Sequence, residues 1–193
     1  GDPRNIPDLT FDQFRSFHSF YYHPSNSRVF FYGDDDPLQR LELLDEYLKE
    51  FDSVSTDSSQ VQLQPKLSAL KRVEVSFPIS PEAELKHMLT VNWVLNHSAM
   101  KPKDALALGM LDYLLLGTSS SALKKALIES NLGESVVGGG LSDELLQSTF
   151  SVGLKGVNQE NIAKVEELIR ITLERLAKEG FSPEDIQAAV NSY

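Results

Sequence analysis

The stretch His87-Met88-Leu89-Thr90-Val91-Asn92-Trp93-Val94-Leu95-Asn96 is the clearest β-strand in this sequence. Leucine, valine and tryptophan occupy every second position, which is the period-two pattern of a strand with one face better buried. Residues 134–140 and 148–155 are predicted as two further strands joined by a short link. Strands are also predicted at 28–32, which is rich in aromatic residues, and at 71–77, which is followed by an acidic loop around Pro81.

Helices are predicted between these strands from apolar residues at helical spacing and from capping signals. Thr10 and Gln13 form a capping-box pattern at the start of an aromatic helix that ends at Pro24. Pro37 follows three aspartates and opens a second helix. The remaining helices are predicted over residues 103–116, 121–130 and 158–178, with Ser121 as an N-cap, Gly180 as a C-terminal stop and a new helix beginning at Ser182.

The order of these elements indicates the fold class. A helix, a strand and a helix are followed by two strands, two helices, two strands and a helix. Consecutive strands favour antiparallel pairing, so we predict an α+β fold, mainly an antiparallel sheet with helices packed on one face. Residues 52–65 are polar without an apolar period, and we interpret them as an exposed connector and not as a domain boundary.

Composition narrows the possible partners. The 193 residues are 41% hydrophobic and 24% charged, with a net charge of −10 and no cysteine. This charge disfavours a phosphate-backbone binder, and the absence of cysteine excludes disulfides, a thiolate nucleophile and a cysteine-based zinc site. Because the apolar runs are far shorter than the roughly 20 residues that span a bilayer, we predict a soluble domain with no nucleic-acid and no membrane partner.

The residue types that carry chemistry do not form a recognisable catalytic pattern. His18 and His23 are five residues apart, and neither H-E-x-x-H nor H-x-x-E-H occurs in the chain. His87 and His97 flank the main strand, and a distant partner would be needed to complete a site with either.

Three further motifs have simpler structural interpretations. Asp34-Asp35-Asp36 fits helix capping better than a calcium loop, and Gly138-Gly139-Gly140 fits a bulge or a close backbone approach better than a phosphate loop. Ser119-Ser120-Ser121 lacks the G-x-S-x-G context of a nucleophile. We therefore predict no catalytic, cofactor-binding or metal-binding residue in this chain.

Four stretches together resemble one family. They are Leu9-Thr10-Phe11-Asp12-Gln13-Phe14 with Tyr21-Tyr22-His23-Pro24-Ser25-Asn26 and Phe31-Tyr32-Gly33-Asp34-Asp35-Asp36-Pro37; His87-Met88 with Asn92-Trp93; Ala107-Leu108-Gly109 with Leu116-Gly117-Thr118; and Asp143-Glu144-Leu145-Leu146-Gln147 through Gly153-Leu154-Lys155-Gly156-Val157. In this order and spacing the chain is similar to the second domain of the pitrilysin-like inverted zincins, in the form of the presequence proteases of mitochondria and plastids.

The resemblance implies a domain with the LuxS/mitochondrial processing peptidase-like fold, inside a large zinc metalloendopeptidase. Four similar domains of such a protease enclose a chamber in which cleaved targeting presequences and other short unstructured peptides are degraded. Zinc is held outside this segment, which would form non-catalytic chamber wall, pack against the remaining domains and be inactive alone. The implied location is the mitochondrial matrix and/or the chloroplast stroma. The acidic balance would favour Arg-rich presequences.

The resemblance also implies a domain division. We expect residues 1–24 to be the final helix of the zinc-binding domain or a lead-in, 25–180 the second domain and 181–193 the start of the next helix. Both ends are expected to be cuts through a longer chain. Two alternatives stay open at this point, namely a metal-free structural or interaction subunit of the same family and a separately encoded half that needs a catalytic partner.

Overall fold

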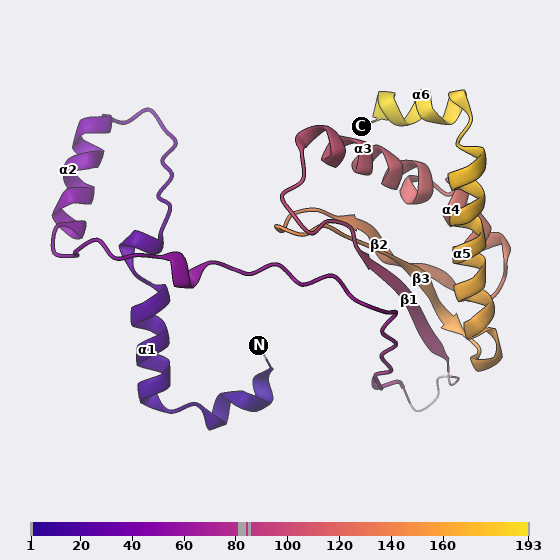
Figure 1. Ribbon diagram of the computed structural model, residues 1–193, viewed down its shortest axis with the longest axis horizontal. Coiled ribbons are helices and arrows are strands. Elements are labelled where there is room, and N and C mark those ends of the chain that lie inside the picture. Colours follow the sequence, from indigo (N-terminus) through magenta and orange to yellow (C-terminus); the bar gives the residue numbers. More distant parts are fainter. Residues whose placement is uncertain (1, 81–83, 85, 193) are drawn as a thin grey trace. The chain divides into compact units, whose positions relative to one another are not determined.

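The structure, a computed structural model, describes residues 2–80, 84 and 86–192. The chain divides into two compact units, Gly1–Gln62 and Leu63–Tyr193, which are described here separately (Figure 1). The division falls inside the polar 52–65 segment that we interpreted as a connector within one domain. The acidic loop predicted around Pro81 lies outside the described residues.

The first unit contains two helices that begin where the sequence predicts. A 3-10 helix, Pro3–Asp8, precedes α1, Phe11–Tyr21, where the Thr10 hydroxyl accepts from Gln13 N–H and the Gln13 side chain accepts from Thr10 N–H. Helix α2, Pro37–Leu48, begins with Asp36 Oδ1 accepting from Leu38 N–H at 2.8 Å. Short 3-10 turns occupy Pro24–Asn26 and Asp57–Ser59. The capping-box and proline signals are confirmed.

The strand predicted at 28–32 is wrong. These residues form no strand in the structure, and Tyr32 keeps 96% of its surface exposed. A strand needs a neighbour that pairs with its N–H and C=O groups, and aromatic content alone does not supply one. In the first unit, α1 and α2 also leave their apolar side chains exposed, including Phe14, Phe17 and Leu41.

The second unit is built on a three-stranded antiparallel sheet in the order β1-β3-β2. Its strands are β1, His87–Val94; β2, Ser135–Ser142; and β3, Thr149–Val157. The register places Trp93 opposite Phe150, with ring centroids 5.8 Å apart, and it places Leu89 opposite Leu154. The alternation that predicted β1 is therefore confirmed, since these residues share the better buried face.

The strand predicted at 71–77 is also absent from this sheet, so that prediction is wrong for the structure described here. Residues 72–77 and Ile79 line a cavity of about 680 Å³ beside residues 86–89 at the start of β1. The segment forms no backbone ladder with any described strand, and a period-two pattern alone does not make a strand without a pairing partner.

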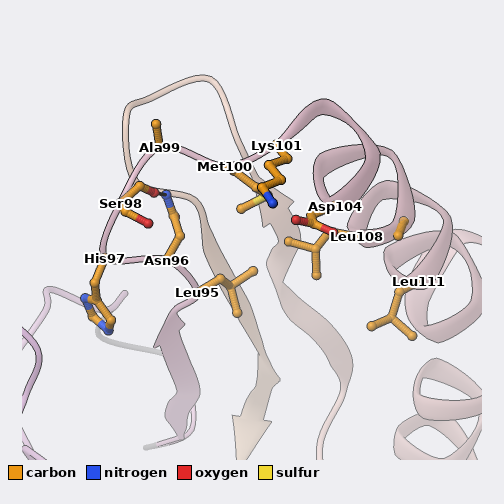
Figure 2. Close-up of a pocket in the computed structure, with 11 residues that line it drawn as sticks. Leu95, Asn96, His97, Ser98, Ala99, Met100, Lys101, Asp104, Leu108 and Leu111 are labelled. Atoms are coloured by element: carbon orange, nitrogen blue, oxygen red, sulfur yellow. Dashed lines mark hydrogen bonds between the residues drawn. The ribbon is translucent and has the colours of Figure 1, made fainter.

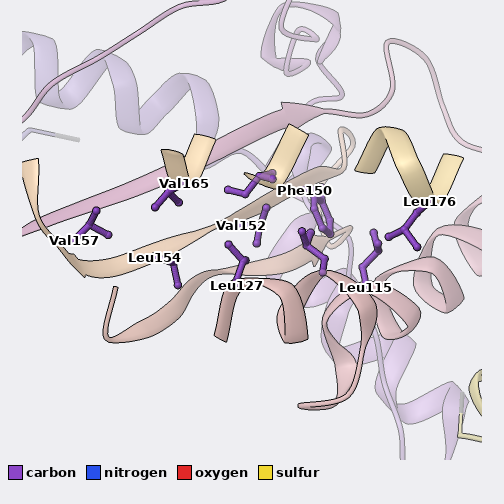
Figure 3. Packing of buried hydrophobic residues seen from close by; sticks show 10 residues of the cluster. Leu115, Leu127, Phe150, Val152, Leu154, Val157, Val165 and Leu176 are labelled. Atoms are coloured by element: carbon purple, nitrogen blue, oxygen red, sulfur yellow. The ribbon is translucent and has the colours of Figure 1, made fainter. Parts of the chain in front are cut away.

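Helices cover one face of the sheet, as predicted. Helix α3, Pro102–Asp112, continues into a π-helical turn, Tyr113–Gly117, and is followed by α4, Ala122–Glu129. Helix α5, Ile162–Glu179, ends at Gly180, which adopts a φ of 75°, and α6 spans Pro183–Ser192. The core formed by β3, α4 and α5 with the π-helical turn is shown in Figure 3 and consists of Leu115, Leu123, Leu127, Phe150, Val152, Leu154, Val157, Val165, Ile169 and Leu176.

Residues 102–129 have the length and hydropathy of a membrane-crossing helix. The backbone nevertheless leaves the helix after Gly117, because Thr118 adopts φ −127° and ψ 168° and Ser121 adopts ψ 139°. The Ser121 hydroxyl closes this corner by donating to Tyr113 O at 2.9 Å and accepting from Thr118 N–H at 3.0 Å. Leu123 and Leu127 then enter the core, whereas Leu106 and Leu111 on α3 remain exposed.

Candidate functional site

A pocket of about 650 Å³ lies where the loop after β1 meets α3 (Figure 2). Its apolar side chains come from both elements, and polar groups from Asn96 to Asp104 stand around them. Such a mixture of an apolar lining and a few polar groups is typical of binding pockets. The lining consists of Leu95, Asn96, His97, Ser98, Ala99, Met100, Lys101, Asp104, Ala107, Leu108 and Leu111.

Carboxamide side chains fix the loop that borders this pocket. Asn96 Oδ1 accepts from Ser148 N–H at 2.7 Å, and Asn96 Nδ2 donates to Ser98 O at 2.8 Å and to Leu146 O at 3.1 Å. Gln147 Nε2 donates to Asn96 O at 3.1 Å and to Gln64 O at 3.1 Å. These bonds join three chain segments, and the pocket loop is therefore held by side chains as well as by the sheet.

The pocket offers both charged and apolar groups to a ligand. Within the described part of the chain, no pocket residue forms the hydrogen-bonded nucleophile and base that covalent catalysis uses. Lys101 and Asp104 bring charges of both signs to its edge, while Met100 and Leu108 present apolar surface. The arrangement suits the capture of an apolar side chain next to polar backbone groups.

Asp112 is a partly buried carboxylate of the second unit. It ends α3, and its Oδ1 accepts from Leu141 N–H at 2.9 Å. Burial raises the pKa of Asp112, the Leu141 hydrogen bond opposes this shift, and the charge of Asp143 adds to it. A Cβ at Gly140 would collide with the Asp112 carboxylate, and Gly140 has a φ of +72° that favours glycine. Asp112 thus has a structural explanation, as an anchor between α3 and β2.

Each unit contains two histidines, which occupy separate structural positions within their unit. His18 lies on α1 with its ring stacked on Tyr22, and His23 Nδ1 accepts from Ser25 N–H at 3.2 Å at a turn. In the second unit His87 begins β1 and His97 belongs to the pocket loop. No group of three or more histidine, cysteine, aspartate or glutamate residues among the described residues has the geometry to hold a metal ion.

The other motifs have the structural roles that we favoured. Asp36 caps α2, and the Asp35 carboxylate pairs with Arg40, which holds the pKa of Asp35 below its usual value. The β2–β3 register shifts between Val137 and Gly140, where a Cβ on Gly138 would lie 2.6 Å from the Ser151 backbone. The predicted bulge with close backbone approach is confirmed. Ser121 supports the helix corner and is not exposed as a nucleophile would be.

Comparison with known proteins decides the family. Residues 8–193 match the family described as "Peptidase M16 inactive domain". The chain belongs to the peptidase M16 family. The match to its inactive domain agrees with the resemblance noted above and supports a non-catalytic segment of a metallopeptidase. The α+β prediction is likewise confirmed.

Curated relatives give the subfamily. The chain is 51% identical over 195 residues to "Presequence protease 1, chloroplastic/mitochondrial" of Arabidopsis thaliana, covering 100% of this chain and 18% of the relative. It is 33% identical over 196 residues to "Presequence protease, mitochondrial" of Xenopus laevis, covering 99% of this chain and 19% of that protein. The chain therefore spans about a fifth of the length of these M16 relatives. Their names support the organellar localisation predicted from the sequence.

A solved structure supports the fold alone. A protease from Helicobacter pylori superposes with a TM-score of 0.64 at 22% identity, covering 100% of this chain and 46% of that one. This likeness agrees with an M16-type α+β architecture.

Sequence reasoning missed the contribution of Gln147 and Asn96. Gln147 was noted only as the end of a motif, and Asn96 only as a strand position. Their partners lie 83 and 52 residues away, in Gln64 and Ser148, so no local spacing indicates the pairing. The one available signal was that both carboxamides lie where a predicted strand meets a loop, where side chains often bind backbone groups.

Proposed function

We propose that this chain is a non-catalytic wall segment of a zinc metalloendopeptidase that degrades cleaved presequences and other short unstructured peptides inside a closed chamber. The observation that carries the proposal is the match of residues 8–193 to the inactive M16 domain, combined with 51% identity to a presequence protease. The catalytic residues and the zinc belong to other parts of the parent protein. No residue of this segment is assigned a catalytic, cofactor-binding or metal-binding role.

Surface chemistry supports a segment that is covered by other parts of a larger protein. Helix α1 exposes Phe11, Phe14 and Phe17, and large apolar residues this exposed usually mark an interaction surface. Helix α3 is apolar on most of its circumference, and Leu106 remains half exposed. A helix that is apolar all round belongs in the interior of a larger assembly. The remaining domains of the parent protease are the partners that fit these surfaces.

The domain ranges follow the same proposal. Residues 1–24 would end the zinc-binding domain or lead in from it, 25–180 would form the second domain and 181–193 would begin the next helix. In the parent enzyme the polypeptide from α1 onwards would then line and close the chamber. Peptide substrates are the proposed ligands, and neither nucleic acid nor a membrane takes part.

Peptide cleavage by the purified 193-residue chain tests the proposal. The chain is incubated with zinc and a fluorogenic presequence, its bound metal is analysed in parallel, and the complete parent protein is assayed beside it. We expect no turnover and no bound zinc for the chain, and chelator-sensitive turnover for the parent. Chelator-sensitive turnover by the chain alone would contradict the proposal, and His87 and His97 would be the first residues to mutate.

The same assay separates the two alternatives. A parent protein without H-x-x-E-H and without turnover would be a structural or interaction subunit. A parent that begins near residue 1 and gains activity only when mixed with a zinc-containing partner would be a separately encoded half.

A further inference from the structure

The outer edge of β1 has no strand beside it within the described residues. In the order β1-β3-β2, β3 pairs with one side of β1 and the other side stays open. Open edges expose unpaired N–H and C=O groups and pair readily with another extended segment, so folded proteins cover or disguise them. The core face of β1 carries Leu89, Val91 and Trp93, each partly buried against the core cluster. The structure therefore leaves a half-buried strand with one free edge.

Residues 64–79 run along this edge in the opposite direction to β1. Gln64 is tied to the far end of β1, because Gln147 binds its backbone and Asn96 O together. Residues 72–77 and Ile79 lie beside residues 86–89 at the near end, where they line the cavity of about 680 Å³. The segment can be followed in Figure 1 as far as residue 80. Its direction is that of an antiparallel neighbour.

Apolar and polar side chains alternate along residues 72–77, as expected for a strand with one face on the core. Val73, Val75 and Phe77 alternate with Arg72, Glu74 and Ser76, and the three apolar residues are now 66%, 80% and 53% exposed. Opposite residues of an antiparallel pair share a face. A register that puts Phe77 opposite His87 also puts Val75 opposite Leu89 and Val73 opposite Val91. All three apolar side chains then reach the face that packs on the core.

We propose that the outer edge of β1 is a strand-pairing site and that its occupant is residues 71–77 of this chain, which add as a fourth antiparallel strand when the parent protein assembles. The structure described here is the unpaired arrangement. Pairing closes the cavity and turns the three exposed side chains inwards. It also blocks the edge to other extended peptides, so the wall segment does not capture substrate there. This inference is independent of whether the parent is an active protease.

One contact opposes the change. Arg72 donates two hydrogen bonds to the Glu166 carboxylate of α5, at 3.0 and 2.9 Å. In the proposed register Arg72 turns to the face away from α5, so this ion pair is exchanged for the strand pairing. Both partners are partly exposed, and exposed ion pairs contribute little to stability, whereas burial of three large apolar side chains contributes much more.

Disulfide trapping tests the register directly, because these 193 residues contain no cysteine and any cysteine elsewhere in the parent protein can first be replaced by serine. Glu74→Cys with Thr90→Cys places thiols at opposite positions on the open face, where neither substitution disturbs the core. The control is Ser68→Cys with Thr90→Cys, which lies several positions out of register. In the complete protein we expect the Glu74/Thr90 pair to form an intramolecular disulfide about tenfold faster than the control pair.

Each other outcome overturns the proposal. Equal rates for the two pairs would mean that residues 71–77 do not lie on the edge in this register. Disulfide-linked dimers would assign the edge to a second copy. If the β1 amides were protected from hydrogen exchange only after a peptide is added, the outer edge of β1 would pair with an external strand instead. Glu166→Gln provides a further check, since removal of the competing ion pair is expected to speed trapping of the Glu74/Thr90 pair and to leave the control pair unchanged.

Discussion

The side chain of Gln147 binds the backbone of Gln64 on both sides, accepting from Gln64 N–H at 2.6 Å and donating to Gln64 O at 3.1 Å. The carboxamide thus reproduces the pair of bonds that a neighbouring strand would make. Because the same Nε2 also donates to Asn96 O, one side chain joins two segments of the second unit.

We predict that Gln147→Ala lowers the free energy of unfolding by about 1 kcal/mol, since it removes several partly exposed hydrogen bonds. Urea unfolding followed by the fluorescence of Trp93, the single tryptophan, measures this change. The matched control is Gln64→Ala, which keeps the backbone that Gln147 binds and should leave stability nearly unchanged. A Gln147→Ala protein that is as stable as the wild type would show that the carboxamide contributes nothing.

Asp112 gives a prediction with a defined dependence on pH. Burial raises its pKa in the folded state above the ordinary value of 3.8, so the unfolded chain releases this proton first as the pH rises. The contribution of Asp112 to stability is therefore complete below 3.8 and decreases as the pH rises through the raised pKa. Asp112→Asn does not titrate and keeps an oxygen for Leu141 N–H.

We expect Asp112→Asn to have a higher free energy of unfolding than the wild type at pH 7. The difference between the two proteins should be smaller at about pH 3.5. Asp112→Ala is the contrasting variant, because it also does not titrate but leaves the Leu141 N–H without its partner, so it should be about 1–3 kcal/mol less stable than Asp112→Asn at either pH. Unfolding curves of the three proteins at both pH values measure these differences. If the difference in unfolding free energy between Asp112→Asn and the wild type were the same at both pH values, the raised pKa of Asp112 would be contradicted.

Local sequence patterns predicted the elements whose partners are near in the chain. The capping box at Thr10, the proline start of α2 and the stop at Gly180 depend on three or four neighbouring residues, and each is present. The alternation in β1 was decisive because β3 supplies its partner. Residues 28–32 and 71–77 have equally good strand composition and lack a partner, since strand formation is decided by pairing over long sequence distances.

The candidate site was harder to predict from the sequence, because it also depends on partners that are distant in the chain. His97 was recognised as a possible site residue from its type, and it does border the pocket. The remainder of the pocket depends on where the loop after β1 meets α3, which Asn96 and Gln147 fix through backbone groups distant in the sequence. Such backbone partners leave no pattern of residue types.

Net charge leads to a prediction about substrates. The chain carries −10, so long-range attraction should favour a basic presequence over its charge-reversed version. Binding of both peptides to the parent protein, with its chemistry stopped by zinc removal, is measured at low and at physiological salt. We expect the basic peptide to bind more tightly and to lose this advantage as salt screens the charges. Equal affinity for the two peptides would disprove a role for the acidic balance.

Exposed aromatic residues on α1 predict that the isolated chain associates with itself. Phe14 and Phe17 are 63% and 58% exposed on one helix, and apolar surface of this kind aggregates when its natural cover is missing. Sedimentation of the purified chain should therefore show an average mass that increases with concentration. Phe14→Ser with Phe17→Ser should shift the protein towards monomer, because the association is driven by apolar surface.

A matched variant separates this effect from a general change of solubility. Asp12→Ser with Arg15→Ser alters the same helix and leaves both phenylalanines in place, so it should associate as the wild type does. Trp93 fluorescence confirms that the second unit stays folded in every variant. A wild-type chain that remains monomeric at high concentration would contradict the prediction, and it would also weaken the inference that these surfaces are covered by other domains of the parent protease.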